Sequence, residues 1–471
     1  MKNSSLYIST AALLFVLLTH VRAAAHDTLS LAQCRQMAIE HNLTLRSAER
    51  TIDKQKAERW ALRTLYLPKI SGRAVLAHMA TNLKKDIYMP TAKFNPATNQ
   101  MEPNLLLDPS GNPIVAAGTP LFELYGYMPM EIEAKKAYMA GINLEQPLFT
   151  GGKIRAANAM ANIGVELAEQ NASLQRQKAI AEADEAYWTY VSVREKVKLA
   201  QTAVALLDTI TTQMRNAVET GLKHRSELLK IQVQRNEAEL NQQKAQNGLA
   251  LARMALARAI GLPLNSPIET ADSLIGSAPL PPQSEADISQ RPEYRLLSGQ
   301  VQLQEQQIKL QQADFMPLVG ISAGYSFLGG VKLTGMELKT NGLAILGSVS
   351  IPIFHWGEGQ QKMKAANISK EIKEMELERY SQLMQLEMEQ ARLNLNDART
   401  RINLSEQALA MAEEHLRLSR NAYELGGETI TNLLLAQTQW QQASAELIEA
   451  KADYMLKQTL YLKAAGLPLE Q

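Results

Sequence analysis

Two long stretches of this sequence, residues 153–219 and 358–424, contain no proline and only one glycine each. Apolar residues recur in them at intervals of three and four, as Val204, Leu207 and Ile210 do. This spacing indicates helices with coiled-coil-like packing. A continuous helix of that length is roughly 100 Å long, which a globular core cannot enclose. The sequence therefore predicts extended helices that pack side by side.

The two stretches belong to an internal duplication, because several landmarks recur at one constant shift of 205 residues. A constant shift predicts helical tracts of equal length in the two halves. Each long tract ends at a glycine turn and is followed by a returning helix, so the predicted hairpins cover 153–260 and 358–465. The landmark pairs are 146–152 with 351–357, Gly221 with Gly426, and 261–264 with 466–469.

Between the helices, alternation of apolar and small residues predicts β-strands. Ile321 and Ala323 alternate with Gly320, Ser322 and Gly324, a period of two that is typical of a membrane strand with one lipid-facing side. Four strands are predicted, at about 70–80, 139–149, 318–328 and 341–353. Proline lacks an N–H group and disfavours helix in the residue before it. Four prolines are therefore predicted to mark helix–strand transitions: Pro68, Pro147, Pro317 and Pro352.

The first half is longer than the second. Residues 66–68 resemble 315–317, but the shift here is 249, so about 44 additional residues follow in the first half. They fall at about 81–138, where seven prolines predict a long irregular loop. The predicted organisation is a signal peptide at 1–25, a first repeat at 26–264, a linker at 265–292 and a second repeat at 293–471.

The N-terminus has the pattern of a secretory signal: Lys2, then an apolar stretch at 6–18, then the small residues 23–25. The apolar stretch is too short for a bilayer core of roughly 30 Å, although an uncleaved anchor remains the alternative. Cys34 is the only cysteine, so no internal disulfide is possible, and we expect a buried thiol. A formal net charge of +1 argues against a nucleic-acid partner.

Four short strands cannot close a barrel. Open strand edges in lipid leave backbone groups unpaired, at several kcal/mol each, so strands in the membrane would require several copies of the chain. Aromatic residues near the transition prolines, such as Tyr66, Phe149 and Trp356, suit an interfacial belt or an ordinary core. We find no nucleophile–base motif, phosphate loop or metal-ligand cluster. No catalytic, cofactor-binding or metal-binding residues are therefore predicted, and an enzyme is not expected.

Nearly all of the mature chain, about 28–469, resembles two tandem repeats of the TolC family of outer-membrane efflux proteins. The motifs that carry the resemblance are the opening 29–42, the run 66–68, the segment Pro147–Gly152 and the tip segment 424–437. The resemblance implies an α+β, mainly α, membrane fold. The resemblance further implies a homotrimer with a 12-stranded barrel in outer-membrane lipid, four strands per protomer, and a periplasmic α-barrel of twelve helices.

The resemblance also implies the exit duct of an efflux or secretion system in a Gram-negative bacterium. Such a duct docks with a periplasmic adaptor protein and a proton-driven or ATP-driven inner-membrane pump, and exports small molecules. The insertion at 81–138 would face the outside of the cell. The hairpin tips would close the tube and bind the adaptor. The tip residues that the resemblance assigns to docking are Gly221, Leu222, Ser226, Gly426, Gly427 and Thr429.

In the family's archetype, a tyrosine on one tip bonds a carboxylate on the other and helps to hold the gate shut. Aligned on the tip glycines, those positions are Tyr423 and Glu227, which we interpret as a latch, with ordinary helix-surface residues as the alternative. The archetype's latch arginine falls on Glu428. Its tunnel carboxylates fall on Asn432 and Leu435. These departures put the acidic ring in doubt and predict weaker cation selectivity.

Other functions remain open at this point. Methionine thioethers suit copper(I), so methionines in or beside the first loop allow a metal-efflux duct, or simply packing. A periplasmic adaptor would have β-rich domains flanking a single hairpin, and a structural coiled-coil stalk without its own pore would need no membrane strands. The methionines concerned are Met79, Met89, Met101, Met128, Met130 and Met139.

Overall fold

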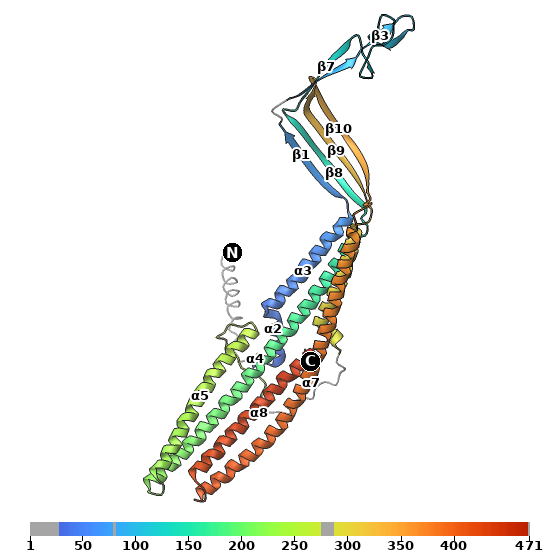
Figure 1. Cartoon of the computed structure of the whole chain (residues 1–471). Helices are drawn as coiled ribbons and strands as arrows, with labels where there is room; N and C mark the ends of the chain where they lie inside the picture. Colours follow the sequence, from blue (N-terminus) through green and yellow to red (C-terminus); the bar gives the residue numbers. More distant parts are fainter. Residues whose placement is uncertain (1–27, 79–81, 275–286, 470–471) are drawn as a thin grey trace, which may run out of the picture. The chain divides into compact units, whose positions relative to one another are not determined.

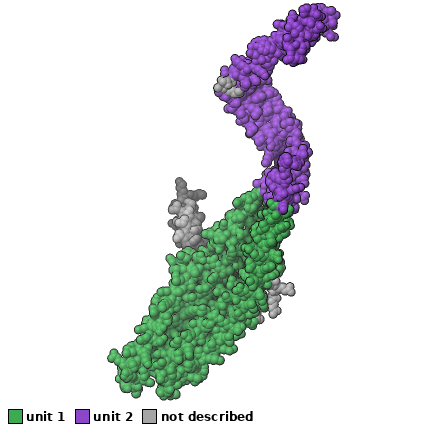
Figure 2. Space-filling view, viewed as in Figure 1, with its two compact units in different colours: residues 1–59, 159–306, 365–471 green, residues 60–158, 307–364 purple. Residues whose placement is uncertain are grey.

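The computed structural model (Figure 1) describes residues 28–78, 82–274 and 287–469, so the expected signal peptide lies outside the described residues. The chain divides into two compact units, coloured separately in Figure 2. Within the described residues, no helix is both long and apolar enough to span a membrane. Unit 1 comprises residues 1–59, 159–306 and 365–471, and unit 2 comprises residues 60–158 and 307–364.

Two long helical hairpins dominate the chain (Figure 1). The outgoing helices have 67 residues each and the returning helices 35 each, as the constant shift predicts. Gly221 and Gly426 end the outgoing helices with φ of 77° and 80°, the left-handed conformation that glycine adopts without strain. The helices are α4 (Lys153–Glu219) and α5 (Arg225–Ala259) in the first hairpin, and α7 (Glu358–Glu424) and α8 (Ile430–Ala464) in the second.

Shorter helices precede the first strand of each repeat. The helix α2 begins with a capping box in which Ser30 and Gln33 bond reciprocally. The helix α6 has proline at its first position, where the missing N–H costs nothing. These helices are α2 (Leu31–His41), α3 (Leu43–Arg63) and α6 (Pro292–Ala313), with 3₁₀ turns η1 (Thr64–Tyr66) and η2 (Ile288–Gln290).

Four antiparallel strands lie side by side in the order β1-β8-β9-β10 (Figure 1). They overlap the four segments in which alternation predicts strands, and β9 and β10 continue further toward their connecting turn. Among these four, β1 and β10 are the outer strands, and each pairs on one side only within the described chain. The C-terminal end of β9 also pairs with β7 (Tyr125–Glu133), which pairs with β2 (Leu83–Pro90), so the complete sheet has six strands. The bounds are β1 (Lys69–Ala77), β8 (Ala137–Phe149), β9 (Leu318–Leu333) and β10 (Met336–Ser350).

The prediction of an irregular loop at 81–138 was wrong, because this segment contains ordered hairpins. Three of its seven prolines, Pro90, Pro103 and Pro120, sit at strand ends, where the missing N–H does not interrupt a ladder, whereas Pro129 lies inside β7. Proline content alone could not distinguish these positions from loop positions. The strands are β2 (Leu83–Pro90), β3 (Ala92–Asn95), β4 (Gln100–Pro103), β5 (Val115–Ala116), β6 (Thr119–Pro120) and β7 (Tyr125–Glu133).

Three of the four transition prolines lie between a helix and a strand, and Pro147 does not. Pro68 and Pro317 directly precede β1 and β9, and Pro352 follows β10. Pro147 lies inside β8, opposite Gly320, next to a register shift. The β1–β8 pairing already ends at Glu145, so Pro147 has a strand on one side only. Proline is tolerated at such an edge and bulge.

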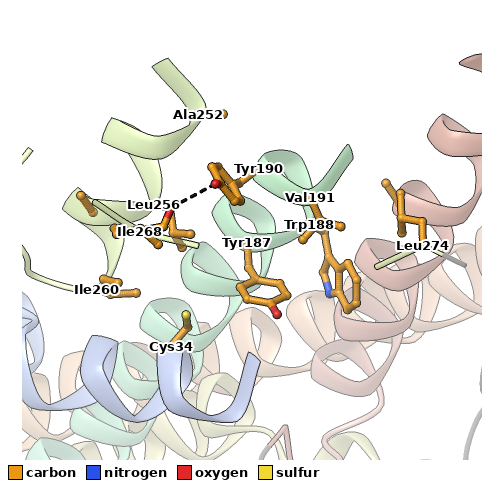
Figure 3. Packing of buried hydrophobic residues seen from close by; sticks show 12 residues of the cluster. Cys34, Tyr187, Trp188, Tyr190, Val191, Ala252, Leu256, Ile260, Ile268 and Leu274 are labelled. Atoms are coloured by element: carbon orange, nitrogen blue, oxygen red, sulfur yellow. Dashed lines mark hydrogen bonds between the residues drawn. The ribbon is translucent and has the colours of Figure 1, made fainter. Parts of the chain in front are cut away.

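A buried cluster in unit 1 joins the N-terminal helix to the first hairpin (Figure 3). Tyr187 of α4 and Leu256 of α5 are fully buried with Cys34 of α2. The hydroxyl of Tyr190 donates to the backbone oxygen of Ile268, 3.0 Å away. Cys34 is the buried thiol expected from the sequence. Burial, with a smaller contribution from nearby carboxylates, raises its pKa to about 12.

Candidate functional site: the hairpin tips and the open sheet

The first tip, between α4 and α5, is closed by backbone hydrogen bonds around Gly221. The N–H groups of Gly221 and Leu222 donate to the oxygens of Val218 and Ala217, over 3.1 and 2.8 Å, which satisfies the last carbonyls of α4. The His224 ring accepts from the N–H of Ser226, 3.2 Å away, and so caps α5. The Leu222 side chain is 77% exposed.

The second tip, between α7 and α8, has the same construction. Gly426 and Gly427 donate to Tyr423 and Ala422, over 3.1 and 2.8 Å. The Thr429 hydroxyl accepts from the N–H of Asn432, 3.3 Å away, and caps α8. Leu425 is 88% exposed, so each tip carries one bare leucine. Leu425 is not among the docking residues that the resemblance assigns. In the sequence, an apolar residue directly beside the glycine of the turn could have identified Leu425 as a tip residue.

The two hairpins pack together behind their tips. Ile430 and Leu433 of α8 are buried against Ile210, Met214 and Ile231 of the first hairpin. The residues of the two hairpins lie about 200 positions apart in the chain, so this apolar cluster fixes the two tips relative to each other. Tyr423, half-buried at its margin, belongs to the second tip.

Tyr423 contacts the first hairpin in two ways. Its hydroxyl donates to the sulfur of Met214, 3.9 Å away, and the Lys223 ammonium lies 5.0 Å from its ring centroid, within cation–π range. Burial, and secondarily the negative charge of Glu227, raises the pKa of Tyr423. Met214 and Lys223 were missed by sequence reasoning, because only tertiary packing brings them to Tyr423.

The partner expected for Tyr423, Glu227, lies in the first turn of α5. Its Oε2 atom is buried without a hydrogen-bond partner. In this structure the Tyr423 hydroxyl donates to Met214 and not to Glu227. The Tyr423 hydroxyl and the Glu227 carboxylate thus influence each other electrostatically, but no hydrogen bond joins them in this structure. Asn432 lies in the first turn of α8.

The four-stranded part of the sheet has two chemically different faces. One cross-strand row places Ile142, Tyr325 and Leu343 in register on the same side, and all three are exposed. The next row places Asn143 opposite Gly324 on the other side, where Ser322 and Ser348 also lie by alternation. A sheet with one bare apolar face and one small polar face suits a wall between lipid and water.

The described residues offer little that could bind a metal ion. No group of three or more His, Cys, Asp or Glu side chains within the described ranges is arranged to hold a metal ion. Of the loop methionines, Met89 of β2 and Met128 of β7 are diagonal neighbours in the strand register, and Met101 lies on β4. Met79 lies outside the described residues.

Comparisons with known proteins cover most of the chain. Residues 123–262 and 288–465 match the family described as outer membrane efflux protein. The chain is 22% identical over 330 residues to the alkaline protease secretion protein AprF of Pseudomonas aeruginosa, covering 68% of this chain and 67% of that protein.

Solved structures extend the similarity to the fold. The chain is similar to CusC, with a TM-score of 0.72, 16% identity and coverage of 93% and 92% of the two chains. It is also similar to the outer membrane protein VceC from Vibrio cholerae, with a TM-score of 0.70, 16% identity and coverage of 93% and 96%. At these identities the structures show a shared fold.

Proposed function

Because this chain belongs to the outer membrane efflux protein family, we propose that three copies of it assemble into one continuous export duct. The resemblance drawn from the sequence is thereby confirmed, and the chain is an outer-membrane exit channel with a large periplasmic portion. Members of this family are channels and not enzymes. The number of copies, the partners and the gate are our proposals and are argued below.

The open sheet is the observation that carries the proposal. Its strands alternate in direction, so the outer strands β1 and β10 run antiparallel to each other. The β10 strand of one copy can therefore pair with β1 of the next and continue the antiparallel ladder. In lipid this pairing removes unpaired backbone groups that cost several kcal/mol each.

Three copies give twelve strands, and the number matters for the lumen. Two copies would give eight, and side chains fill the interior of an eight-stranded barrel. With three copies, the face that bears Asn143, Ser322 and Ser348 lines a wider, water-filled lumen, and the face that bears Ile142, Tyr325 and Leu343 meets lipid.

The helices support the same assembly. The outer surface of α5 exposes Val233 and Leu251, and that of α7 exposes Leu404 and Met411. Apolar residues at helix-like spacing on a water-exposed surface favour a helical neighbour. In a ring of three protomers, α5 of one copy and α7 of the next cover each other, and twelve helices form the periplasmic tube.

At the tips we propose a gate and a docking surface. Tyr423 and the orphaned carboxylate oxygen of Glu227 supply a donor and an acceptor whose bond would hold the hairpins together in the closed state. The bare side chains of Leu222 and Leu425 supply apolar anchors for a periplasmic adaptor, beside the glycine turns. An inner-membrane pump then delivers small molecules to the duct.

Detergent gels and planar bilayers together separate the export duct from the alternative, a periplasmic coiled-coil protein without a pore. The protein, extracted from outer membranes, should migrate as a trimer in detergent gels until it is heated, and should conduct ions in planar bilayers. A water-soluble monomer without conductance would overturn the duct. A trimer without conductance would support the structural stalk.

A further inference from the structure

The apolar face of the sheet is hollowed at the end opposite to Pro68 and Pro317. Tyr138 and Phe327 lie there in successive cross-strand rows, with the small Ala140 opposite Phe327. Because Ala140 cannot fill the space between the two rings, a cavity remains. It measures about 470 Å³ and is lined by Tyr138, Ala140, Phe327, Leu328, Lys339, Thr340 and Asn341.

The position of Tyr138 is set by the neighbouring strand. A Cβ atom at Gly329 would lie 2.5 Å from the Tyr138 hydroxyl oxygen and 2.6 Å from Cζ, so the ring lies across β9 in room that only glycine leaves. At this level the β9–β10 register shifts between Leu338 and Thr340. The shift sets two β9 residues, Gly329 and Gly330, against the single Lys339, and Lys339 lines the same cavity as Tyr138.

Lys339 is the charged residue in the lining of this cavity. The Lys339 ammonium lies 3.0 Å from the Glu337 carboxylate, and both side chains are largely exposed, so their pairing is weak and can be exchanged. Lys136 is an exposed residue two positions before Tyr138, and its backbone oxygen lies against Gly330, next to Gly329. Lysine stems cover apolar surface while their ammonium groups stay in water.

We propose that this cavity binds a phosphorylated, multiply acylated glycolipid of the outer leaflet. A phosphate group contacts Lys339 and Lys136, and an acyl chain lies along Tyr138, Ala140 and Phe327. The inference rests on the proposed function, because helices in the periplasm place this end of the sheet in the outer leaflet. Basic pockets bind anionic head groups, and aromatic side chains settle at the membrane interface. A zwitterionic phospholipid is attracted to the lysines more weakly, since the positive charge of its own amine offsets the negative charge of its phosphate.

Native mass spectrometry of the detergent-solubilised assembly tests the site. Bis-phosphorylated lipid A is titrated against dephosphorylated lipid A, phosphatidylethanolamine and inorganic phosphate. Lys339→Gln and Lys136→Gln should each weaken binding of the phosphorylated lipid about fivefold, since one lysine near a charged lipid contributes about 1 kcal/mol. Lys85→Gln, an exposed lysine on β2 that does not line the cavity, is the matched control and should bind as the wild type does.

Each outcome has a distinct meaning. Equal binding of the phosphorylated and dephosphorylated lipids, or an equal loss in Lys85→Gln, overturns the site. Displacement of the lipid by an equal concentration of inorganic phosphate reduces it to a simple anion site and also overturns the proposal. Lys339→Gln should keep wild-type conductance in planar bilayers. A wild-type protein without conductance would instead count against the export duct itself.

Discussion

The ammonium group of Lys223 lies 5.0 Å from the ring centroid of Tyr423, so the first hairpin tip covers an aromatic ring of the second. The same ring reaches Met214 through its hydroxyl, 3.9 Å from the sulfur. One residue thus joins the two repeats at their tips through a cation and a thioether. This contact lies within one protomer, so it can hold the tips together before any contact between protomers forms.

Removing the cation should loosen the tips. We expect Lys223→Gln to shift the closed-to-open ratio by roughly two- to fivefold, because a partly exposed cation–π contact contributes about 0.5–1 kcal/mol. The open probability in planar bilayers measures this change. Lys230→Gln, in the second turn of the following helix α5 and exposed to solvent, is the control. A similar increase in both variants would indicate a general charge effect and not the ring contact.

Breaking the buried ion pair between α2 and α4 should strongly destabilise unit 1. The Arg35 guanidinium donates two bonds of 2.7 Å to Asp184, which is fully buried and also accepts from Thr459 of α8. Asp184→Ala should lower the free energy of unfolding by about 3–5 kcal/mol, because it leaves a buried charge unpaired.

Thermal unfolding followed by circular dichroism measures the loss. The exposed pair Arg50–Asp53 offers the control, since Asp53→Ala should change stability by less than about 1 kcal/mol. Equal effects of the two substitutions would show that burial does not decide the contribution of the ion pair.

Part of this architecture follows from the sequence. The absence of proline and the constant shift set the length of α4 and α7, and the glycine landmarks set their turns at Gly221 and Gly426. Local signals suffice there, because helix continuity and left-handed turns are decided within a few residues. The strands follow from alternation in the same way.

Other features depend on packing that no local pattern encodes. The ring of Tyr423 meets Lys223 and Met214 only because the two hairpins pack along their length. Pro147 was predicted to mark a helix–strand transition, but whether proline interrupts a ladder depends on which neighbours the strand has at that level. The hairpins within 81–138 were missed for the same reason.

The sheet offers a matched pair of glycines. Gly141 and Gly342 lie in one cross-strand row, both opposite Ser326. A Cβ atom at Gly141 would lie 2.8 Å from the Tyr325 oxygen, whereas Gly342 has open space. Gly141→Ala should therefore push β8 from β9 and lower the temperature at which the trimer dissociates in detergent gels. Gly342→Ala should not, and a trimer equally stable in both variants would contradict this geometry.

Alkaline pH should destabilise unit 1 through Cys34. Burial raises the pKa of the folded thiol from 9.0 to about 12, so the unfolded chain loses this proton first as the pH rises. The protonated thiol therefore contributes its full share to the free energy of unfolding below pH 9, and this share is lost between pH 9 and about 12. Chemical denaturation at a series of pH values should show a shallower alkaline decline for Cys34→Ala than for the wild type. Identical slopes would mean that the thiol titrates normally.

The latch can be separated from the cation contact. Tyr423→Phe alone should already weaken the gate, because it removes the donor of the proposed closed-state bond and otherwise only a weak bond to a thioether. Combined with Glu227→Gln, it removes both the donor and the charged acceptor of the closed-state bond, so single-channel conductance should rise. Burial, and secondarily the charge of Glu227, raises the pKa of Tyr423, so the phenol stays protonated in neutral and mildly alkaline solution, and wild-type conductance should not change through this group between pH 7 and 9.

Glu237→Gln, an exposed carboxylate further along α5, serves as the control for charge alone. If the double variant conducts as the wild type does, Tyr423 and Glu227 are ordinary helix-surface residues. If Glu237→Gln opens the channel equally, the tip carboxylate has no special role. An increase confined to the Tyr423 and Glu227 variants leaves the paired donor and acceptor as its cause, because the tip backbone and the apolar cluster behind it are unchanged.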